Sequence, residues 1–412
     1  MKHACGLGVL VMVALVVAAA GAFGDDWTQF QGPERNGISN ETGLLKQWPD
    51  GGPKLLWTAT GCGTGFSSAA IAAGTVYVAG DVGENCQVMA LDLTGKVKWT
   101  KVIGKSGQGG GHPGARSTPT VDGDSVYCLG PVGDLACLDA KTGNVKWSGN
   151  IINTFKGRIP QWQLAESVLI DGNNLICTPG GQDTTLVALN KKTGAPVWTS
   201  KGLSDPAAYA SPILFTVGKL RMISTLTARG VVAVDASNGK FLWRYDRPSN
   251  TTANIPSPAF YKDCVFCATG YKKGGGLVQV TVNGTEALAK ELWQTSDFVN
   301  HHGGYVIIDD HIYGYGDGGG WTCLDFKTGQ VAWQVQGVSK GSVIAADGML
   351  YCLGERRVMG LMKVDPAAGE LVSHFRLPTK GPEPSWAHPA IANGRLYIRD
   401  FDSLLCYDIK GK

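Results

Sequence analysis

The sequence predicts an all-β fold, an eight-bladed β-propeller that is closed by an N-terminal strand completing the last blade. Three observations favour this fold. The 412 residues include 58 glycines and are 43% hydrophobic and 17% charged, a composition typical of a globular β protein with many tight turns. A hairpin signature recurs along the chain, and its closing tryptophans lie 40 to 51 residues apart from Trp57 to Trp333. That spacing is typical of propeller blades, and no helical period competes with it.

The first residues carry the pattern of a secretory signal. Lys2 is followed by an apolar run from Cys5 to Val17 and then by small residues up to Ala22, the order of segments that precedes cleavage. The run becomes rich in Gly and Ala towards its end, which disfavours the alternative of an uncleaved membrane anchor. We expect a signal peptide at 1–24, an N-terminal extension at 25–52 and one propeller domain at 53–412. The mature protein is expected to be periplasmic or secreted, with no transmembrane segment.

The recurring signature is a strand that ends in Asp or Asn, a glycine turn, and a strand that closes on Trp, which together form a hairpin. A second hairpin lies upstream of each copy, and two hairpins make one four-stranded blade. The fifth copy is stretched and the seventh has no Trp. The seven copies are Ala90–Trp99, Cys137–Trp147, Ala188–Trp198, Ala233–Trp243, Val280–Trp293, Cys323–Trp333 and Lys363–Ser373.

The eighth blade is divided between the two ends of the chain. The last copy runs from Ala390 to Asp408 and stops without a fourth strand, whereas residues 53–57 have the form of a closing strand with no hairpin before them. We expect this N-terminal strand to complete the last blade. Closure of the ring would remove exposed sheet edges and leave a central channel rimmed by loops.

The eleven cysteines are interpreted by position, because the chain is long enough to be stabilised by its own core. Most occupy strand positions where other blades have small apolar residues, which favours buried packing thiols over disulfides. Cys128 and Cys137 are the best disulfide candidates, since they are expected to face each other across one hairpin. Cys264 and Cys267 would point to opposite faces of a strand, so a metal or haem site is not expected there.

The repeated tryptophans occupy one position in nearly every blade, which indicates packing between blades rather than ligand stacking. Function is expected where the repeats diverge, in the segments that lead to the channel mouth. Such a rim would bind an anionic or quinone-like ligand, hold a metal, or simply be solvated and ion-paired; the sequence leaves these open. The channel-rim candidates are Arg116, Glu166, His301, His302, Lys340, Trp386 and His388.

The repeat Ala-Leu-Asp-x-x-Thr-Gly-x-x-x-Trp resembles that of the pyrroloquinoline quinone (PQQ)-type propellers over nearly the whole mature chain. The segments Trp27 to Gly37, Asn300 to Gly304 and Ala387 to Pro389 look like those of exported PQQ-like repeat proteins of planctomycete-type bacteria. The wider family implies two activities: quinoprotein dehydrogenases with PQQ and Ca²⁺ in the channel, and an outer-membrane assembly scaffold that binds proteins. The chain departs from both, because it has no adjacent cysteine pair, c-type haem motif, alignable catalytic acid or lipoprotein cysteine.

We therefore expect an extracytoplasmic PQQ-like propeller that acts as a ligand- or protein-binding module. No set of catalytic residues is recognisable in the sequence. The alternative is a PQQ-dependent oxidoreductase of alcohols or sugars, in which Arg116 and Lys340 would contact the quinone and Glu166 would be the metal ligand or base. No matched ligands support PQQ or Ca²⁺, so the cofactor stays unknown. The formal net charge of +3 gives no electrostatic case for nucleic acid. The partner is a protein or a small molecule at the rim, and the chain is expected to be a monomer.

Overall fold

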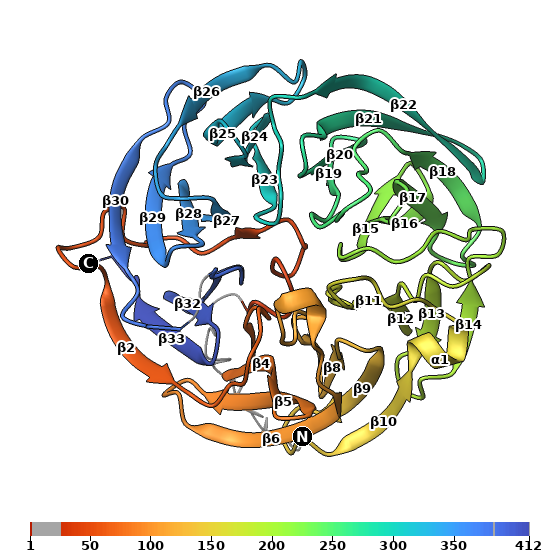
Figure 1. The fold of residues 1–412 in the computed structure, drawn as a ribbon, viewed down its shortest axis with the longest axis horizontal. Helices are drawn as coiled ribbons and strands as arrows, with labels where there is room; N and C mark the ends of the chain where they lie inside the picture. Colours follow the sequence, from red (N-terminus) through yellow and green to blue (C-terminus); the bar gives the residue numbers. More distant parts are fainter. Residues whose placement is uncertain (2–25, 382–383, 412) are drawn as a thin grey trace.

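The computed structural model describes residues 1, 26–381 and 384–411, so the predicted signal peptide falls on residues outside the described ones apart from Met1. Eight four-stranded antiparallel units surround a central axis, with the first strand of each unit innermost and the last on the outer rim (Figure 1). The predicted all-β, eight-bladed propeller is confirmed.

The first four blades follow one another in the chain. Blade 1 contains β3 (Ala70–Ala72), β4 (Thr75–Val82), β5 (Asn85–Asp92) and β6 (Val97–Lys105). Blade 2 contains β7 (Thr120–Asp122), β8 (Ser125–Leu129), β9 (Asp134–Asp139) and β10 (Val145–Asn150). Blade 3 contains β11 (Leu169–Asp171), β12 (Asn174–Cys177), β13 (Val187–Asn190) and β14 (Pro196–Thr199). Blade 4 contains β15 (Ile213–Val217), β16 (Leu220–Leu226), β17 (Val231–Asp235) and β18 (Phe241–Tyr245).

The remaining blades complete the ring. Blade 5 contains β19 (Ala259–Tyr261), β20 (Cys264–Thr269), β21 (Gly274–Asn283) and β22 (Glu286–Thr295). Blade 6 contains β23 (Tyr305–Ile308), β24 (His311–Gly316), β25 (Gly320–Asp325) and β26 (Val331–Val335). Blade 7 contains β27 (Gly341–Ala346), β28 (Met349–Gly354), β29 (Val358–Lys363) and β30 (Leu371–Arg376). Blade 8 contains β31 (Ala390–Ala392), β32 (Arg395–Asp400), β33 (Ser403–Asp408) and β2 (Lys54–Ala59).

In most blades an Asp or Asn at the end of the third strand organises the outer hairpin. In blade 1, Asp92 Oδ1 accepts hydrogen bonds from Thr94 N (2.8 Å), Thr94 Oγ1 (2.6 Å) and Lys96 N (3.1 Å). Gly95 follows with φ +83°, a left-handed conformation that glycine adopts without strain. The Asp, Thr and Gly of the repeat are therefore a turn motif.

The closing tryptophans join neighbouring blades. The indole Nε1 of Trp57, for example, donates to Leu93 O in blade 1 at 2.9 Å, and the turn glycine of that blade, Gly95, packs against the same ring. Equivalent indole-to-carbonyl bonds are made by Trp99, Trp147, Trp198, Trp293 and Trp333. The tryptophans are thus packing residues, as their repetition indicates.

Closure of the ring takes place in blade 8, as predicted. Strand β2 from the N-terminal side pairs with β33 from the C-terminal end, for example Trp57 with Cys406. A second early strand, β1 (Ile38–Ser39), adds to blade 7 in parallel with β27. Two distant parts of the chain therefore hold the ring together.

The ten cysteines that the structure describes are buried free thiols. The expectation that Cys128 and Cys137 face each other is wrong, because the register pairs Cys128 with Ala136 and Cys137 with Tyr127. Cys264 and Cys267 do point to opposite faces of β20, since they pack into different hydrophobic clusters. Apolar packing between blades, rather than cross-linking, accounts for these positions.

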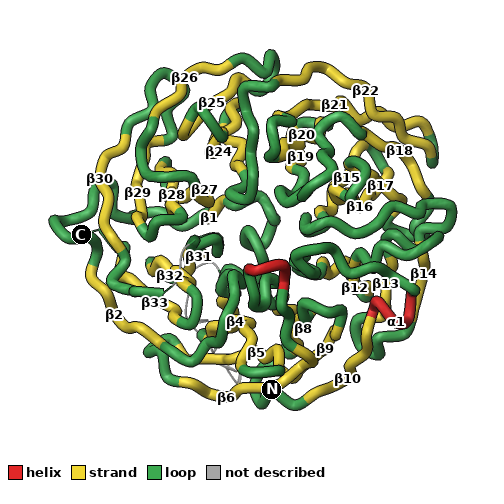
Figure 2. Tube along the Cα trace, in the orientation of Figure 1, coloured by secondary structure: helices red, strands yellow, loops and turns green. Residues whose placement is uncertain are grey.

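The helices are short. The α-helix α1 (Ile151–Phe155) begins where the Asn150 side chain accepts a hydrogen bond from Asn153 N, and ends at Lys156 in the left-handed conformation. The 3₁₀ turn η1 (Gly109–Gly111) forms from the glycine-rich loop; Figure 2 shows it in red near the centre of the ring. Within the described residues, no helix is both long and apolar enough to cross a membrane.

Candidate functional site

A belt of side-chain hydroxyls lines part of the channel and joins successive blades from blade 1 to blade 5. Ser68 N donates to Thr118 Oγ1 (3.1 Å), Thr118 N to Ser167 Oγ (2.9 Å), Ser167 N to Ser211 Oγ (2.9 Å), and Ser211 N to Ser257 Oγ (3.0 Å). We call these five residues the hydroxyl belt. These four backbone N–H groups are each satisfied by the next blade, which fixes the inner ends of blades 1 to 5 relative to one another.

The hydroxyl belt stops where the ring changes residue type. In every blade except blade 4, the belt position lies four residues before the last residue of the innermost strand. At this position blade 6 has Gly304 and blade 8 has His388 in place of a Ser or Thr. A Cβ at Gly304 would lie 3.2 Å from both Gln31 Nε2 and His388 Cε1. The absence of a side chain at Gly304 therefore leaves room for two larger ones beside the channel.

We call residues 26–52 the N-terminal segment; its first part enters the channel, and its last part lies on the outer strand β30. Trp27 bridges to Ile71 of β3 through two backbone hydrogen bonds of 2.9 and 2.8 Å. Further along, the buried Arg35 donates from Nη1 to Ser167 O (2.9 Å) and Pro212 O (2.8 Å). The segment is thereby anchored to blades 1, 3 and 4, and it contributes side chains to the centre of the molecule.

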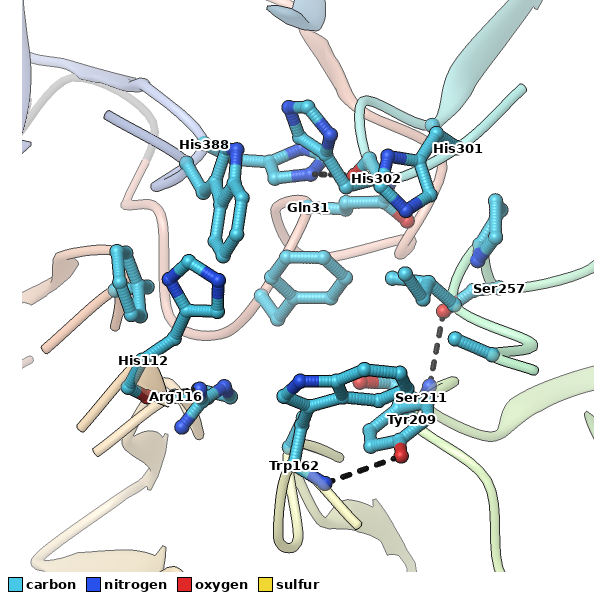
Figure 3. A pocket seen from close by; sticks show the side chains of 18 of the residues that line it. Gln31, His112, Arg116, Trp162, Tyr209, Ser211, Ser257, His301, His302 and His388 are labelled. Carbon is cyan, nitrogen blue, oxygen red and sulfur yellow. Dashed lines mark hydrogen bonds between the residues drawn. The ribbon is translucent and has the colours of Figure 1, made fainter. Parts of the chain in front are cut away.

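A cavity of about 320 Å³ opens at the centre of the ring, next to the N-terminal segment (Figure 3). Blades 1 to 6, the segment and the stretch that precedes β31 all contribute to it. Five of the seven sequence candidates line it, together with fourteen other residues. The lining residues are Phe30, Gln31, Phe66, His112, Arg116, Trp162, Ala165, Tyr209, Ser211, Ala253, Ile255, Pro256, Ser257, Tyr271, His301, His302, Gly304, Trp386 and His388.

Aromatic rings form most of the cavity wall. Trp386 lies 5.1 Å from Phe66, 4.9 Å from His112 and 5.5 Å from His302 between ring centroids. On another side, Trp162 lies 6.0 Å from Tyr209. Such walls present flat, polarisable faces to a bound molecule.

Arg116 is the cation of the cavity lining. Its Nη1 donates to Gly114 O at 2.8 Å and its Nη2 donates to His112 O, and the guanidinium lies 5.2 Å from the Phe66 ring centroid. Burial lowers the pKa of Arg116 to about 10, so the group stays charged at neutral pH.

Three histidines lie together on the opposite side of the cavity from Arg116 (Figure 3). Burial lowers the pKa of His301 to about 4, helped by the nearby Lys340, and burial also lowers the pKa of His388 to about 4. Burial takes the pKa of His302 well below its usual range. These imidazoles are therefore neutral at physiological pH, and the cationic character of the cavity comes from Arg116.

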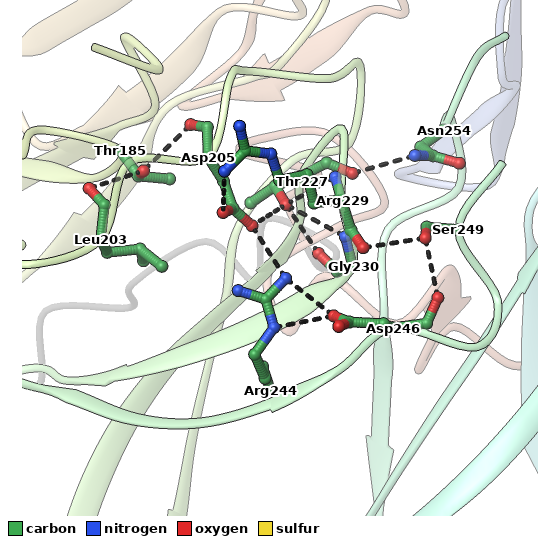
Figure 4. Close-up of polar contacts among 10 residues, drawn as sticks. All are labelled: Thr185, Leu203, Asp205, Thr227, Arg229, Gly230, Arg244, Asp246, Ser249 and Asn254. Atoms are coloured by element: carbon green, nitrogen blue, oxygen red, sulfur yellow. Dashed lines mark hydrogen bonds and ion pairs between the residues drawn. The ribbon is translucent and has the colours of Figure 1, made fainter. Parts of the chain in front are cut away.

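The loop that carries Ala253 to Ser257 is held by a polar network (Figure 4) whose members are not among the lining residues. Asn254 Nδ2 donates to Thr227 O at 3.0 Å, and Thr227 Oγ1 donates to the buried Asp205 at 2.7 Å. Arg244 adds an ion pair to Asp205 at 3.4 Å. This network fixes one wall of the cavity without facing it.

Two sequence candidates do not line the cavity. Glu166 is 2% exposed and accepts a hydrogen bond from Thr178 N at 2.6 Å; burial raises its pKa to about 7, which the Thr178 hydrogen bonds and the charge of Arg35 oppose. Lys340 forms an ion pair with Asp317 at 2.8 Å. Their assignment to a binding surface stays a prediction.

Several lining residues were not foreseen from the sequence. Phe30 and Gln31 come from the N-terminal segment, whose place in the channel has no counterpart in the repeat. His112 and Trp162 lie in long connections before β7 and β11, outside the repeated hairpins. Gly304 and His388 could have been recognised from the sequence. When the innermost strands are aligned, the other blades have Ser or Thr at the position of these two residues.

The lining residues do not fit Ca²⁺ or a Ca²⁺-dependent PQQ site. Ca²⁺ takes six to eight oxygen ligands, of which carboxylates are the main protein contribution. The described lining residues include no Asp or Glu, and residues 26–381 and 384–411 hold no cluster of three His, Cys, Asp or Glu side chains arranged for a metal.

The fold and its central cavity define a PQQ-like repeat propeller. A family model described as outer membrane protein assembly factor BamB matches residues 48–150 and 106–335. These ranges cover more than half of the chain, which therefore belongs to this family.

Curated relatives include proteins with different activities. Tetrathionate hydrolase of Acidithiobacillus ferrooxidans is 23% identical over 53% of this chain and 44% of its own length, and quinoprotein alcohol dehydrogenase PedH of Pseudomonas putida is 27% identical over 50% and 33%. The chain thus spans less than half the length of these two relatives. BamB of Shewanella oneidensis is 22% identical over 75% of this chain and 77% of its own.

Solved structures show the same fold. BamB of Moraxella catarrhalis superposes with a TM-score of 0.63 at 16% identity, covering 87% of this chain and 98% of that chain. Quinohemoprotein alcohol dehydrogenase of Comamonas testosteroni gives 0.65 at 12% identity, covering 94% and 81%. The fold is therefore found in both assembly factors and dehydrogenases, and it does not choose between these activities.

Proposed function

We propose that the protein is an extracytoplasmic propeller that binds a small organic molecule in its central cavity. The observation that carries this function is a central cavity of about 320 Å³ whose walls are mostly aromatic and whose described lining contains one cation and no carboxylate. A few polar groups set in an apolar, ring-lined hollow are the usual composition of small-molecule sites.

The test uses 2-naphthol, a neutral aromatic molecule, as a probe of the cavity. Titration should quench the fluorescence of Trp162 and Trp386 and should saturate. The variant Ala165→Trp fills the cavity with a larger side chain and should abolish saturable binding. The matched control Val102→Trp adds the same side chain on the outer strand β6, where Val102 is 47% exposed, and should bind normally. Equal binding by wild type and Ala165→Trp, or none by wild type, would overturn the proposal.

The oxidoreductase alternative is disfavoured by the absence of a described acid in the lining. It requires that PQQ raise the melting temperature more strongly with Ca²⁺ than without, because a ligand that binds the folded state selectively stabilises it. A saturable Ca²⁺-dependent shift that disappears in Glu166→Gln would reinstate it. We expect no dependence on Ca²⁺.

The extracytoplasmic location rests on the apolar run that ends near Ala22 and on the family to which the chain belongs. Fractionation of cells expressing the full chain, followed by N-terminal sequencing, should find the mature protein outside the cytoplasm with cleavage near residue 24. Retention of the whole chain in the cytoplasm would contradict it.

A protein-binding role is the second candidate, and one observation favours it. The hairpin of β21 and β22 has ten-residue strands, and Leu288 on it is 71% exposed with Leu292 46% exposed. Exposed apolar side chains on an extended hairpin suit a contact with another protein. In that case Leu288→Asp should abolish a pull-down interaction from the source organism while leaving 2-naphthol binding unchanged.

A further inference from the structure

Arg116 differs from the other interior arginines in what surrounds it. Arg35 is enclosed by backbone carbonyls and the Gln29 amide oxygen. Arg399 is likewise fully buried and donates to Cys62 O and Gly63 O at 3.1 and 2.7 Å. Arg116 instead faces the cavity.

Arg116 forms no ion pair within 4 Å in the described part of the chain, and the charge of the buried Asp81 acts on it only from a longer distance. None of the ion pairs there involves it, and its printed hydrogen bonds engage only the carbonyls of Gly114 and His112. A guanidinium has five N–H donors, so others remain for a ligand. A partly buried cation that no carboxylate contacts directly can still pair with an anion that enters the cavity, and a carboxylate matches its planar geometry.

The surroundings of Arg116 are shaped for a flat molecule. The guanidinium lies over the Phe66 ring, and Phe66 in turn lies 5.1 Å from Trp386. Trp162 is on the same side of the cavity as Arg116 (Figure 3). An anionic group at Arg116 would therefore bring an attached aromatic ring into contact with these walls.

A second polar group lies across the cavity from Arg116. The Gln31 side chain lines the cavity, and among the described residues it has no hydrogen-bond partner. Its amide offers both a donor and an acceptor. Gly304 leaves space for it, since a Cβ there would lie 3.2 Å from Gln31 Nε2, and Figure 3 shows Gln31 on the side of the histidines.

We propose that the ligand is a flat aromatic monocarboxylate with a hydrogen-bonding substituent, such as a hydroxyl, on the side away from the acid. The carboxylate pairs with Arg116, the ring lies against the aromatic walls, and the substituent bonds to the Gln31 amide. This identification of the ligand class rests on the proposed function, and it needs no metal and no covalent step.

The experiment compares four related probes by fluorescence titration: 2-naphthol, 2-naphthamide, 2-naphthoate and 6-hydroxy-2-naphthoate. Wild type should bind 2-naphthoate about 10- to 100-fold more tightly than the neutral amide of the same shape, because hydrogen bonds to charged groups are the strong ones. The added hydroxyl should improve affinity about 3- to 10-fold. Raised salt should weaken the naphthoate more than the amide.

Variants separate the two contacts. Arg116→Gln should bind 2-naphthoate and 2-naphthamide equally, whereas Arg116→Lys should retain part of the preference and shows whether the charge alone matters. Gln31 has φ +60°, which Asn tolerates, so Gln31→Asn should fold and should lose only the benefit of the hydroxyl. Arg158→Gln, at an exposed site, is the matched control and should behave as wild type.

The outcomes distinguish this inference from the proposed function. If 2-naphthol binds in the cavity but wild type shows no preference for the carboxylate, the ligand class is wrong and the proposed function stands. If none of the four probes binds, the proposed function fails as well. A carboxylate preference that persists in Arg116→Gln would also overturn the assignment of the anion site.

Discussion

The outer rim and the centre of this propeller are built by opposite rules. At the rim the same contact recurs around the ring: a closing Trp donates its indole N–H to a carbonyl of the next blade, as Trp99 does to Ala140 O at 3.1 Å. At the centre the hydroxyl belt repeats through blades 1 to 5 and then gives way to Gly304 and His388. Where the belt hydroxyls repeat, they satisfy backbone N–H groups. Where Gly304 and His388 replace them, the residue pattern changes beside the cavity.

The carboxyl groups of the rim and of the centre also differ in burial and in pKa. Rim carboxylates such as Asp92 are only partly buried and stabilise their own turns, and hydrogen bonds from Thr94 lower the pKa of Asp92. Central groups such as Glu166 are buried, and burial raises the pKa of Glu166 to about 7. A change at the centre should therefore alter the response to pH, whereas a change at the rim should alter packing.

The largest expected effect is that of Glu166→Gln on the pH dependence of stability. The folded protein holds the carboxyl with a pKa near 7, against 4.5 for the unfolded chain. Wild type therefore loses stability as the pH rises from about 4.5 to 7, because the unfolded state releases its proton first. Chemical denaturation from pH 4.5 to 8 should show the variant gaining roughly 3 kcal/mol relative to wild type over this range.

The comparison at pH 4.5 is the control for Glu166→Gln, since the carboxyl of the folded protein is then neutral like the amide and the two proteins should differ least over this range. Contributions from the buried histidines are common to both proteins and cancel in the difference. Parallel stability curves would mean that the carboxylate of Glu166 is compensated by Arg35, and the contrast between centre and rim would lose its electrostatic part.

The next effect concerns the rim. In Gly143→Ala, the new Cβ would lie 2.7 Å from Trp99 Cδ2 at a backbone φ of +72°, so both steric overlap and conformational strain are expected. Gly123→Ala, in the same blade at φ +59° with no atom within 4 Å, carries the strain alone. Thermal unfolding should show Gly143→Ala about 2 kcal/mol less stable than Gly123→Ala. Equal losses would show that the indole moves aside and that the contact is not tight.

The sequence predicts the rim better than the centre for a physical reason. Contacts that recur from blade to blade, such as that of Asp92 with its turn or of Trp57 with the next blade, require the same residue types at regular intervals. The sequence therefore shows them as a repeat. The cavity is built from single occurrences: Phe30 reaches it through the path of the N-terminal segment, and His112 through the η1 turn. Arg116 and His388 could be selected because they interrupt the pattern, but their neighbours depend on long-range packing that no local spacing encodes.

The cysteine prediction failed at one pair for a related reason. The sequence places Cys128 and Cys137 in adjacent strands, yet a two-residue side-chain period makes pairing sensitive to a shift of one residue. The observed register opposes Cys128 to Ala136. The sequence therefore predicted which two strands pair, but it did not predict which residues face each other across the pair.

The smallest predicted effect concerns the hydrogen bond from a closing Trp indole to the next blade, which one closing Trp, Trp243, does not make among the described residues. Trp198 and Trp243 close adjacent blades and are 8% and 4% exposed, but Trp198 Nε1 donates to Ala236 O at 3.2 Å whereas Trp243 Nε1 is buried without a partner in the described part of the chain. Blade 5, which follows Trp243, has the stretched hairpin and so lacks the turn that supplies the carbonyl elsewhere. Trp198→Phe should therefore cost about 1 kcal/mol more in denaturant unfolding than Trp243→Phe, because only the first loses a hydrogen bond while both lose similar apolar contact. If the two variants are equally destabilised, the indole bond contributes little, and apolar packing of the ring on its neighbour's turn is what holds the blades together.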